Sequence, residues 1–517
     1  MIKFFIHTSL LKICLQNHIT YFIIKNIFFK EVIYLLKEYL FLQKHINNLY
    51  NNQNQTNTPC LQDIFSKKDY YNLLKIVLDT IKENKNASLT TLRLKLFEKS
   101  GLKETIEEFV YKTKITPGII LDFGTVNTRD TIICGNRQEV IFKNNEFASD
   151  ILPIEQDTIF DLASTSKIFT CIAILKLKEA GLIDLFDPII KYCPEFKNLS
   201  NVTIFDLLKF KTMLVTVPRI DNAESKEEAQ KILKNIYVKE DQNFINAYTD
   251  MGALVLKYVI EKVSKMSFNS FVEEVILKPC QMFDTHLNVP LEKIYRVANE
   301  NYSSIVFKTG KFQTRFNNVP GTPHDKKALS LGHAYGNAPG HAGYFSTKDD
   351  MLKLAHAFCH FEILNQESVF SISDNVVGLE QENFYTRFYG SLVYLKQPDP
   401  KYLSVYPPLS GRSFMSPGFA GTTLYVDPLN KITLFIGSNR LHNRIFQIHP
   451  EQHKNIKIKE FNQKTYSLSN QPDKIICSSF TADKEVLVKK ALDLALQYQF
   501  LEKLLNQDKK LHLVREL

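Results

Sequence analysis

The segment Phe160-Asp161-Leu162-Ala163-Ser164-Thr165-Ser166-Lys167-Ile168-Phe169-Thr170 joins a short extended run to a helical one. Ser164 stands three residues before Lys167, so one helical turn would bring both side chains to the same face. A serine hydroxyl is a weak nucleophile until a base takes its proton, and a desolvated lysine amine can be that base. The unpartnered N–H groups of a helix start can hold a developing oxyanion. The segment therefore predicts the Ser-x-x-Lys chemistry of acyl transfer.

The flanking residues distinguish this motif from chance matches. The same spacing occurs at Ser9–Lys12 and Ser100–Lys103, so the motif alone is equally compatible with an ordinary helix start. Upstream of Ser164, residues 158–162 form a β-compatible run. Downstream, apolar residues recur with a helical period until Gly181, a natural helix stop. These flanks favour a strand, a catalytic serine and a helix in succession.

Distant parts of the chain supply further strands. Residues 119–124 and 131–134 are expected to pair around a turn at Asn127, and 422–426 and 432–436 around Asp427-Pro428-Leu429-Asn430. Between them lies a long helical stretch to about residue 285, and Ser346-Thr347-Lys348-Asp349 predicts a capping box. A last amphipathic helix is expected over residues 484–505. Strands at both ends with helices between them predict an α/β fold whose sheet joins distant segments.

Composition excludes several classes of function. The 517 residues are 44% hydrophobic and 23% charged, as in an ordinary globular protein. The net charge of +9 comes from scattered lysines, so nucleic acid is not an expected partner. The eight cysteines form no Cys-x-x-Cys pair, and the histidines lack metal-ligand spacing, so no metal or cofactor is expected. Dispersed free thiols favour a reducing compartment.

Residues 1–58 differ from the rest of the chain. They are rich in Phe, Ile, Leu and Tyr, with six lysines against two glutamates. No 18-residue run is free of charge, and no signal-peptide core with a cleavage site stands out. A basic amphipathic helix could make peripheral membrane contact here, and a partner-packing or poorly specified extension is an equal alternative. A cytoplasmic or membrane-associated location is favoured over export.

Several longer strings match one known group of proteins. They are 158–167, Gly181-Leu182-Ile183-Asp184-Leu185-Phe186-Asp187-Pro188, Tyr192-Cys193-Pro194-Glu195-Phe196, 340–350 (GHAGYFSTKDD) and Ser416-Pro417-Gly418-Phe419-Ala420-Gly421-Thr422-Thr423. With them the chain resembles the serine β-lactamase and penicillin-binding-protein superfamily, closest to its class C β-lactamase-related branch of esterases and D,D-peptidases. The resemblance implies a β-lactamase/transpeptidase-like fold. This is a mainly antiparallel sheet flanked by N- and C-terminal helices, with an inserted, mostly helical subdomain.

The resemblance also divides the chain into regions. We expect an apolar and basic extension with a linker at residues 1–58 and a helical lead-in at 59–112. A serine hydrolase domain should follow at 113–445. Residues 446–517 would form a C-terminal extension whose terminal helix packs on the sheet.

The second motif of the family corresponds to Tyr248-Thr249-Asp250, with Asp where Asn is usual. The resemblance makes Tyr248 a base or proton shuttle beside Ser164 and Lys167, because a phenol near cationic groups can lose its proton more easily. It also lets Asp250 hydrogen-bond Lys167 or substrate. His341 could face the cleft, and a loop histidine bonded to backbone is an equal alternative.

The third motif departs from the family. Where relatives have Lys-Thr-Gly or His-x-Gly, this chain has Ser416-Pro417-Gly418, without the cation. The N–H of Phe419 could still pair with that of Ser164 as an oxyanion hole, and Gly418 and Ser416 would border the substrate. Recognition of a substrate carboxylate should weaken unless Arg412 substitutes. A literal Lys308-Thr309-Gly310 lacks the following hairpin and is interpreted as a coincidence.

These features predict a serine hydrolase that cleaves a small-molecule ester or amide, or a peptide, through an acyl-enzyme at Ser164. One alternative is a D,D-carboxypeptidase of the cell wall. Another is a weakly active member of the fold that binds partners or organises the cell envelope. A Ser-His-Asp triad through His324 and Asp325 is a further alternative, but no Gly-x-Ser-x-Gly elbow accompanies it.

Overall fold

The computed structural model describes residues 88–515 except 144–145, 240–247, 301, 307–311, 317–319, 333–335, 379, 382–383, 386, 398–404 and 447–479, and a few positions between 73 and 83. The chain divides into two compact units, Met1–Ile64 and Phe65–Leu517, and the described residues belong to the second. The expectations for residues 1–58 and for Lys308-Thr309-Gly310 lie outside the described residues.

A six-stranded antiparallel sheet in the order β12-β13-β14-β1-β2-β3 organises the described unit. The first strand lies in its interior, where Ile119 of β1 pairs with Ser438 of β14. Apolar residues fill these strands on both faces, as a sheet covered on both sides requires. The strands are β1 Gly118–Thr125, β2 Arg129–Lys143, β3 Glu146–Pro153, β12 Phe414–Pro417, β13 Thr423–Asp427 and β14 Ile432–Ser438.

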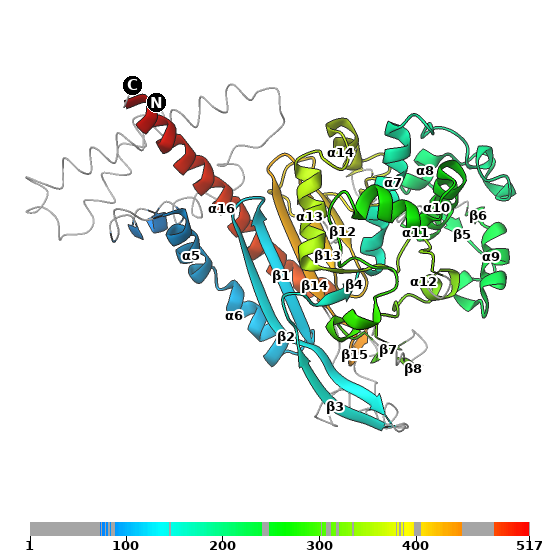
Figure 1. Ribbon diagram of the computed structural model, residues 1–517, viewed down its shortest axis with the longest axis horizontal. Helices are drawn as coiled ribbons and strands as arrows, with labels where there is room; N and C mark the ends of the chain where they lie inside the picture. The colour runs from blue at the N-terminus through cyan, green and yellow to red at the C-terminus, as the bar shows by residue number, and fades with distance from the viewer. Residues whose placement is uncertain are drawn as a thin grey trace, which may run out of the picture. The chain divides into compact units, whose positions relative to one another are not determined.

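Helices from the two ends of the unit cover one face of the sheet (Figure 1). They are α5 Leu89–Ser100, α6 Leu102–Glu107 and α16 Phe480–Arg515. The rings of Phe97 and Tyr498 both stack on Phe123 of β1, with centroids 6.4 and 6.2 Å away. The Tyr498 hydroxyl donates to Asp130 of β2 at 2.6 Å. The C-terminal helix is thus part of the sheet's core.

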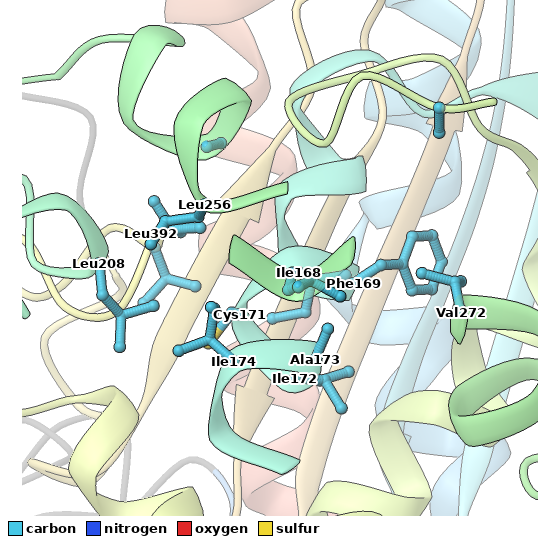
Figure 2. Close-up of a cluster of buried hydrophobic side chains, with 14 of the residues drawn as sticks. Ile168, Phe169, Cys171, Ile172, Ala173, Ile174, Leu208, Leu256, Val272 and Leu392 are labelled. Carbon is cyan, nitrogen blue, oxygen red and sulfur yellow. The ribbon is translucent and has the colours of Figure 1, made fainter. Parts of the chain in front are cut away.

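The opposite face carries α13 (Lys348–Cys359) and the helical region that contains α7 (Lys167–Glu179). Figure 2 shows how the buried side chains of α7 meet Leu208, Leu256 and Leu392 from other segments in one continuous core. The other helices there are α8 Ile204–Leu208, α9 Lys226–Lys234, α10 Met251–Ser264, α11 Phe268–Val272, α12 Lys326–Leu331 and α14 Gln366–Ile372.

Short strand pairs connect these layers. Strands β4 (Ile159–Asp161) and β9 (Phe345–Thr347) pair antiparallel, which brings the segment before Ser164 beside the segment before α13. The remaining strands are β5 Leu214–Val215, β6 Tyr237–Val238, β7 Tyr302–Val306, β8 Phe312–Phe316, β10 Glu380–Gln381, β11 Phe384–Tyr385 and β15 Arg444–Phe446. Among the described helices, none combines the length and the apolar character needed to cross a membrane.

The structure confirms the predicted hairpins and the α/β fold, and it corrects some details. Strand β2 continues well beyond the predicted end at residue 134, because it pairs with β3. The predicted capping box at Ser346 is replaced by a single cap one residue later: the Thr347 hydroxyl accepts the N–H of Asp350. Ser346 instead bonds the hydroxyl of Thr285 at 2.7 Å. Helix α16 extends beyond both ends of the predicted range 484–505.

The contact between α16 and the sheet predicts a stability change. Tyr498→Ala should lower the free energy of unfolding by about 3–5 kcal/mol, because it leaves a cavity beside Phe123. Tyr498→Phe should cost about 1–2 kcal/mol through the lost bond to the partly buried Asp130. Urea unfolding followed by circular dichroism measures both. Tyr295→Ala, at a tyrosine that is 65% exposed, is the matched control and should change little. Equal stability of Tyr498→Ala and Tyr295→Ala would contradict the packing of α16.

Candidate active site

Ser164 lies in a tight turn between β4 and α7. Residues Ala163–Ser166 form a 3-10 turn that leads directly into α7. The helix that was expected to start at Ser164 therefore begins with this tighter 3-10 turn. Ala163 has a φ of +43°, a backbone conformation that residues other than glycine rarely adopt. A local constraint must therefore hold it. The Asp161 carboxylate supplies that constraint by accepting the Ala163 N–H at 2.8 Å. The turn leaves Ser164 partly exposed beside buried neighbours.

Lys167 is fully buried and uses its side chain to join three segments. Its Nζ donates to Ser164 Oγ at 2.9 Å, to Asp250 Oδ1 at 2.8 Å and to the carbonyl of His341 at 3.2 Å. An ammonium group has three donors, so these bonds account for all of them. Burial lowers the pKa of Lys167, and the Asp250 carboxylate acts in the opposite direction. The predicted desolvation of this lysine is therefore present.

A glycine makes the contact with His341 possible. Gly340 has a φ of +92°, and a Cβ there would lie 2.8 Å from the carbonyl of Ala253 in α10. The Gly340 carbonyl accepts the hydroxyl of Thr170 in α7 at 2.5 Å. The loop is therefore pressed against both helices, which brings the next carbonyl to Lys167.

Tyr248 lies on the other side of the serine. Its hydroxyl hydrogen-bonds the Ser164 side chain, and its ring centroid is 5.0 Å from Lys167 Nζ. Burial raises the pKa of Tyr248, and the negative charge of Asp250 raises it further. The expectation that nearby cations would ease loss of the phenol proton is therefore wrong for this arrangement. The aromatic neighbours Tyr389 and Tyr394 help to exclude water.

Asp250 connects the lysine to a second group of charges. Its Oδ2 lies 3.1 Å from Nζ of Lys327, which also lies 3.4 Å from Asp325 Oδ2. Asp325 Oδ1 in turn bonds Nε2 of the buried His341 at 2.9 Å. Burial opposes ionisation of Asp250, but Lys167 and Lys327 hold the pKa of its carboxyl below the usual range. The expected bond between Asp250 and Lys167 is present.

Neither His341 nor His324 has the surroundings that the sequence analysis considered for it. The His341 ring bonds a carboxylate rather than the backbone, and only its carbonyl reaches Lys167. The backbone N–H of His324 donates to Asp161 at 2.8 Å. Because Asp325 pairs with His341, the structure does not support a triad of Ser164, His324 and Asp325.

Two carboxylates and one imidazole of the site lie close enough together to be a candidate metal site. Asp250, Asp325 and His341 each offer a ligand atom within 4.8 Å of the others. However, the ammonium groups of Lys167 and Lys327 already contact these carboxylates. A cation placed among them would be repelled by two positive charges. The donor set therefore fits an ion-pair network better than a metal centre.

The third motif lies beside the serine turn at the end of β12. The Thr165 hydroxyl donates to the Ser416 carbonyl at 3.1 Å, and the buried Ser416 hydroxyl faces the Thr165 carbonyl. Gly418 donates its N–H to Thr422 at 2.7 Å. The next residue, Phe419, has a side chain that is 38% exposed. The backbone of this motif is therefore fixed against the turn that carries Ser164.

Arg412 does not replace the missing cation of this motif. Its guanidinium pairs with Asp374 at 2.6 Å and lies over the Phe370 ring, 5.3 Å from its centroid. Arg440 is nearer the motif: it donates to the Phe419 carbonyl and stacks on the Phe419 ring at 4.6 Å. That guanidinium is almost completely buried, so it supports the loop from beneath.

Sequence reasoning missed two parts of the site. Lys327 carries no motif of its own, although it stands two residues after Asp325. Ala163 gave no signal, because only the backbone geometry shows its unusual conformation. The structure brings Ser164 and Lys167 together, as helical spacing predicted, and places Tyr248 and Asp250 beside them, as the family resemblance implied.

The close approach at Gly418 generates a prediction. A Cβ there would lie 2.4 Å from the Leu162 carbonyl and 2.3 Å from Thr422 Oγ1. Gly418→Ala should therefore displace the serine turn and slow labelling of Ser164 by a fluorophosphonate about 100-fold. Gly411→Ala is the matched control, since nothing lies within 4 Å of its Cβ. Equal labelling rates in the two variants, measured by intact mass, would show that the turn does not depend on this contact.

Comparison with known proteins agrees with this geometry. The family model described as Beta-lactamase matches residues 132–456, more than half of the chain. A putative D-alanyl-D-alanine carboxypeptidase of Salmonella gallinarum is 26% identical over 325 residues, which cover 56% of this chain and 71% of that protein. A protein with that same description from Salmonella typhimurium is 25% identical, with equal coverage.

Solved structures show the same fold. Simvastatin synthase (LovD) of Aspergillus terreus, as the LovD6 mutant, superposes with a TM-score of 0.50 at 14% identity, covering 77% of this chain and 96% of its own. EstCE1, described as a hydrolase with promiscuous acyltransferase activity, gives 0.50 at 14% identity, covering 66% and 93%. At such identities the likeness concerns the fold alone. With the family match, it follows that this chain belongs to the beta-lactamase family, the serine hydrolases of the β-lactamase and penicillin-binding-protein fold.

Proposed function

We propose that the protein cleaves an ester or amide of a small acyl group through an acyl-enzyme on Ser164. The observation that carries the proposal is the 2.9 Å contact between Ser164 Oγ and the buried amine of Lys167. A general base within hydrogen-bond reach of a nucleophile is the geometry that proton abstraction needs. The carbonyl carbon of the substrate bonds to Ser164 Oγ, the leaving group departs, and water later releases the acid.

The proton transfers follow from the contacts of the two basic groups. The neutral Lys167 amine takes the Ser164 proton as the new bond forms. Tyr248, whose burial keeps the phenol protonated, passes its proton to the leaving group and regains one from the ammonium of Lys167, which had received it from Ser164. In this role the raised pKa of Tyr248 is useful, because a neutral phenol is a donor and a phenolate is not.

The oxyanion of the tetrahedral intermediate would be held by backbone groups. The N–H of Ser164 at the start of the turn and the N–H of Phe419 after β12 are the proposed donors. The rigid backbone around Gly418 supports this role, since preorganised donors need no rearrangement during the reaction.

The chemistry of the third motif favours a substrate without a carboxylate. Ser416-Pro417-Gly418 offers no cation, and Arg412 is engaged with Asp374. The exposed ring of Phe419 offers an apolar surface for a small acyl or alkyl group. A β-lactam or a peptide ending in D-alanine would lack an ionic partner at this strand.

An acyl-enzyme on Ser164 predicts a burst of product that depends on this serine. Wild-type protein should hydrolyse p-nitrophenyl acetate with an initial burst equal to the enzyme concentration, because the acyl-enzyme accumulates. Ser164→Ala should abolish the burst and lower the steady rate at least about 1000-fold. Ser200→Ala, at an exposed serine far along the chain, is the control and should match the wild type. A burst that persists in Ser164→Ala would place the nucleophile elsewhere.

A D,D-carboxypeptidase is the second candidate, because relatives at 25–26% identity carry that description. The missing cation argues against it. A charge-assisted hydrogen bond to the terminal carboxylate is worth about 1.5–3 kcal/mol, or roughly 10- to 150-fold in kcat/KM. We therefore expect release of D-alanine from diacetyl-Lys-D-Ala-D-Ala to be slow beside ester hydrolysis, as measured by a coupled amino-acid oxidase assay. Fast release that requires Ser164, with poor ester turnover, would favour the peptidase.

A further inference from the structure

The carboxylate of Asp250 lies between two ammonium groups. One oxygen is 2.8 Å from Nζ of Lys167, and the other is 3.1 Å from Nζ of Lys327. The side chain of Lys327 is only 12% exposed, so solvent screens this contact weakly. Two lysines from α7 and α12 thus share one partly buried acid, whose side chain is 22% exposed.

This arrangement raises a chemical difficulty for Lys167 as a base. A carboxylate at 2.8 Å stabilises the ammonium form, and an ammonium cannot accept the proton of Ser164. The second-motif position that carries Asp250 is occupied in the resembling family by an uncharged asparagine. The negative charge in this chain therefore needs compensation if Lys167 is to be neutral.

Lys327 is held where it can provide that compensation. It lies in the first turn of α12, two residues after Asp325, which caps the helix by accepting the Ala328 N–H at 2.8 Å. Asp325 contacts Lys327 at 3.4 Å and is itself fixed by the buried ring of His341 at 2.9 Å. The Lys327 ammonium is therefore kept between two carboxylates by a rigid cap.

The charges that face Lys167 come from several elements. Asp250 precedes α10, Asp325 and Lys327 belong to the start of α12, and His341 lies in the loop before β9. The phenol of Tyr248 and the hydroxyl of Ser164 complete the surroundings. Without Lys327, two carboxylates would face a single ammonium, which would keep its proton. With Lys327 present, one of those negative charges is matched.

We propose that Lys327 is a positioning residue that neutralises Asp250 and so leaves Lys167 free to take the proton of Ser164. This inference rests on the proposed roles of Ser164 and Lys167 in acyl transfer. Lys327 would act through the charge of Asp250 rather than through contact with the substrate. The direction of the effect also follows, since Lys327 lowers and Asp250 raises the pKa of Lys167.

The test is the pH dependence of Ser164 labelling by a fluorophosphonate. The labelling rate should rise with pH as Lys167 loses its proton, with a midpoint below the ordinary lysine pKa. Lys327→Gln should move this midpoint to higher pH by about one unit or more, because the ammonium of Lys167 gains stability. Asp250→Asn should move it to lower pH. The double variant, which removes one charge of each sign, should return it close to the wild-type position.

Two further variants serve as controls. Lys326→Gln removes the same charge from the exposed neighbouring lysine and should leave the midpoint unchanged. Lys327→Arg keeps the charge and should stay closer to wild type than Lys327→Gln. If Lys327→Gln does not fold by circular dichroism, Asp250→Asn and Lys327→Arg carry the test, and a shift of Asp250→Asn to higher pH would overturn the proposal.

The outcomes separate this inference from the function on which it rests. Labelling at Ser164 with an identical midpoint in Lys327→Gln and wild type would overturn the role of Lys327 alone. Failure of the wild-type protein to be labelled at Ser164 would overturn the proposed function, and this inference with it. A midpoint that moves upward in Lys327→Gln and returns in the double variant supports the proposal.

Discussion

The burial of a single lysine amine is the constraint on which the candidate site depends. Lys167 lies inside the core, where an unpaired ammonium would be costly and an unpaired amine would lose its hydrogen bonds. The fold therefore has to bring partners to it from separate segments: the hydroxyl of Ser164, the carboxylate of Asp250 and the carbonyl of His341. Each partner is positioned by its own local device, namely a 3-10 turn, a helix start and a left-handed glycine. The contacts that allow Lys167 to be buried thus also place its amine beside Ser164.

The sheet that supports the site also brings separate segments of the chain together. Strand β12 carries the third motif at the edge of the sheet, while β1 and β14 form its interior. The serine turn contacts this edge through the backbone at Ser416 and Gly418, where a close approach excludes any larger residue than glycine at the second position. The geometry of the candidate site in this protein therefore depends on how closely the serine turn and the edge strand approach each other.

Sequence reasoning predicted the contact between Ser164 and Lys167 from helical spacing, and it predicted the fold and the meeting of both residues with Tyr248 and Asp250 from the family resemblance. It failed where the outcome depends on contacts across the fold. The pKa of Tyr248 rises because burial outweighs the neighbouring cations, and burial cannot be obtained from spacing. The Arg412 guanidinium is engaged by Asp374, and the proposed role of Lys327 requires knowing that its amine lies beside Asp250, the residue before α10. The cap at Thr347 was also missed, and the Ser346 hydroxyl expected to make it pairs instead with Thr285, which is distant in the sequence.

The position of β1 has a consequence for how the chain reaches its native state. The first strand of the sheet pairs on one side with β2 but on the other with β14, and the hydroxyls of Thr116 and Ser438, 322 residues apart, meet at 2.7 Å. During synthesis the early hairpin must therefore wait, with one backbone edge unpaired, until most of the polypeptide has emerged. Contacts of such long sequence separation slow folding, and an open strand edge invites association with other chains. The nascent protein thus has a long interval of exposure to aggregation, in which chaperones would have their greatest effect on yield.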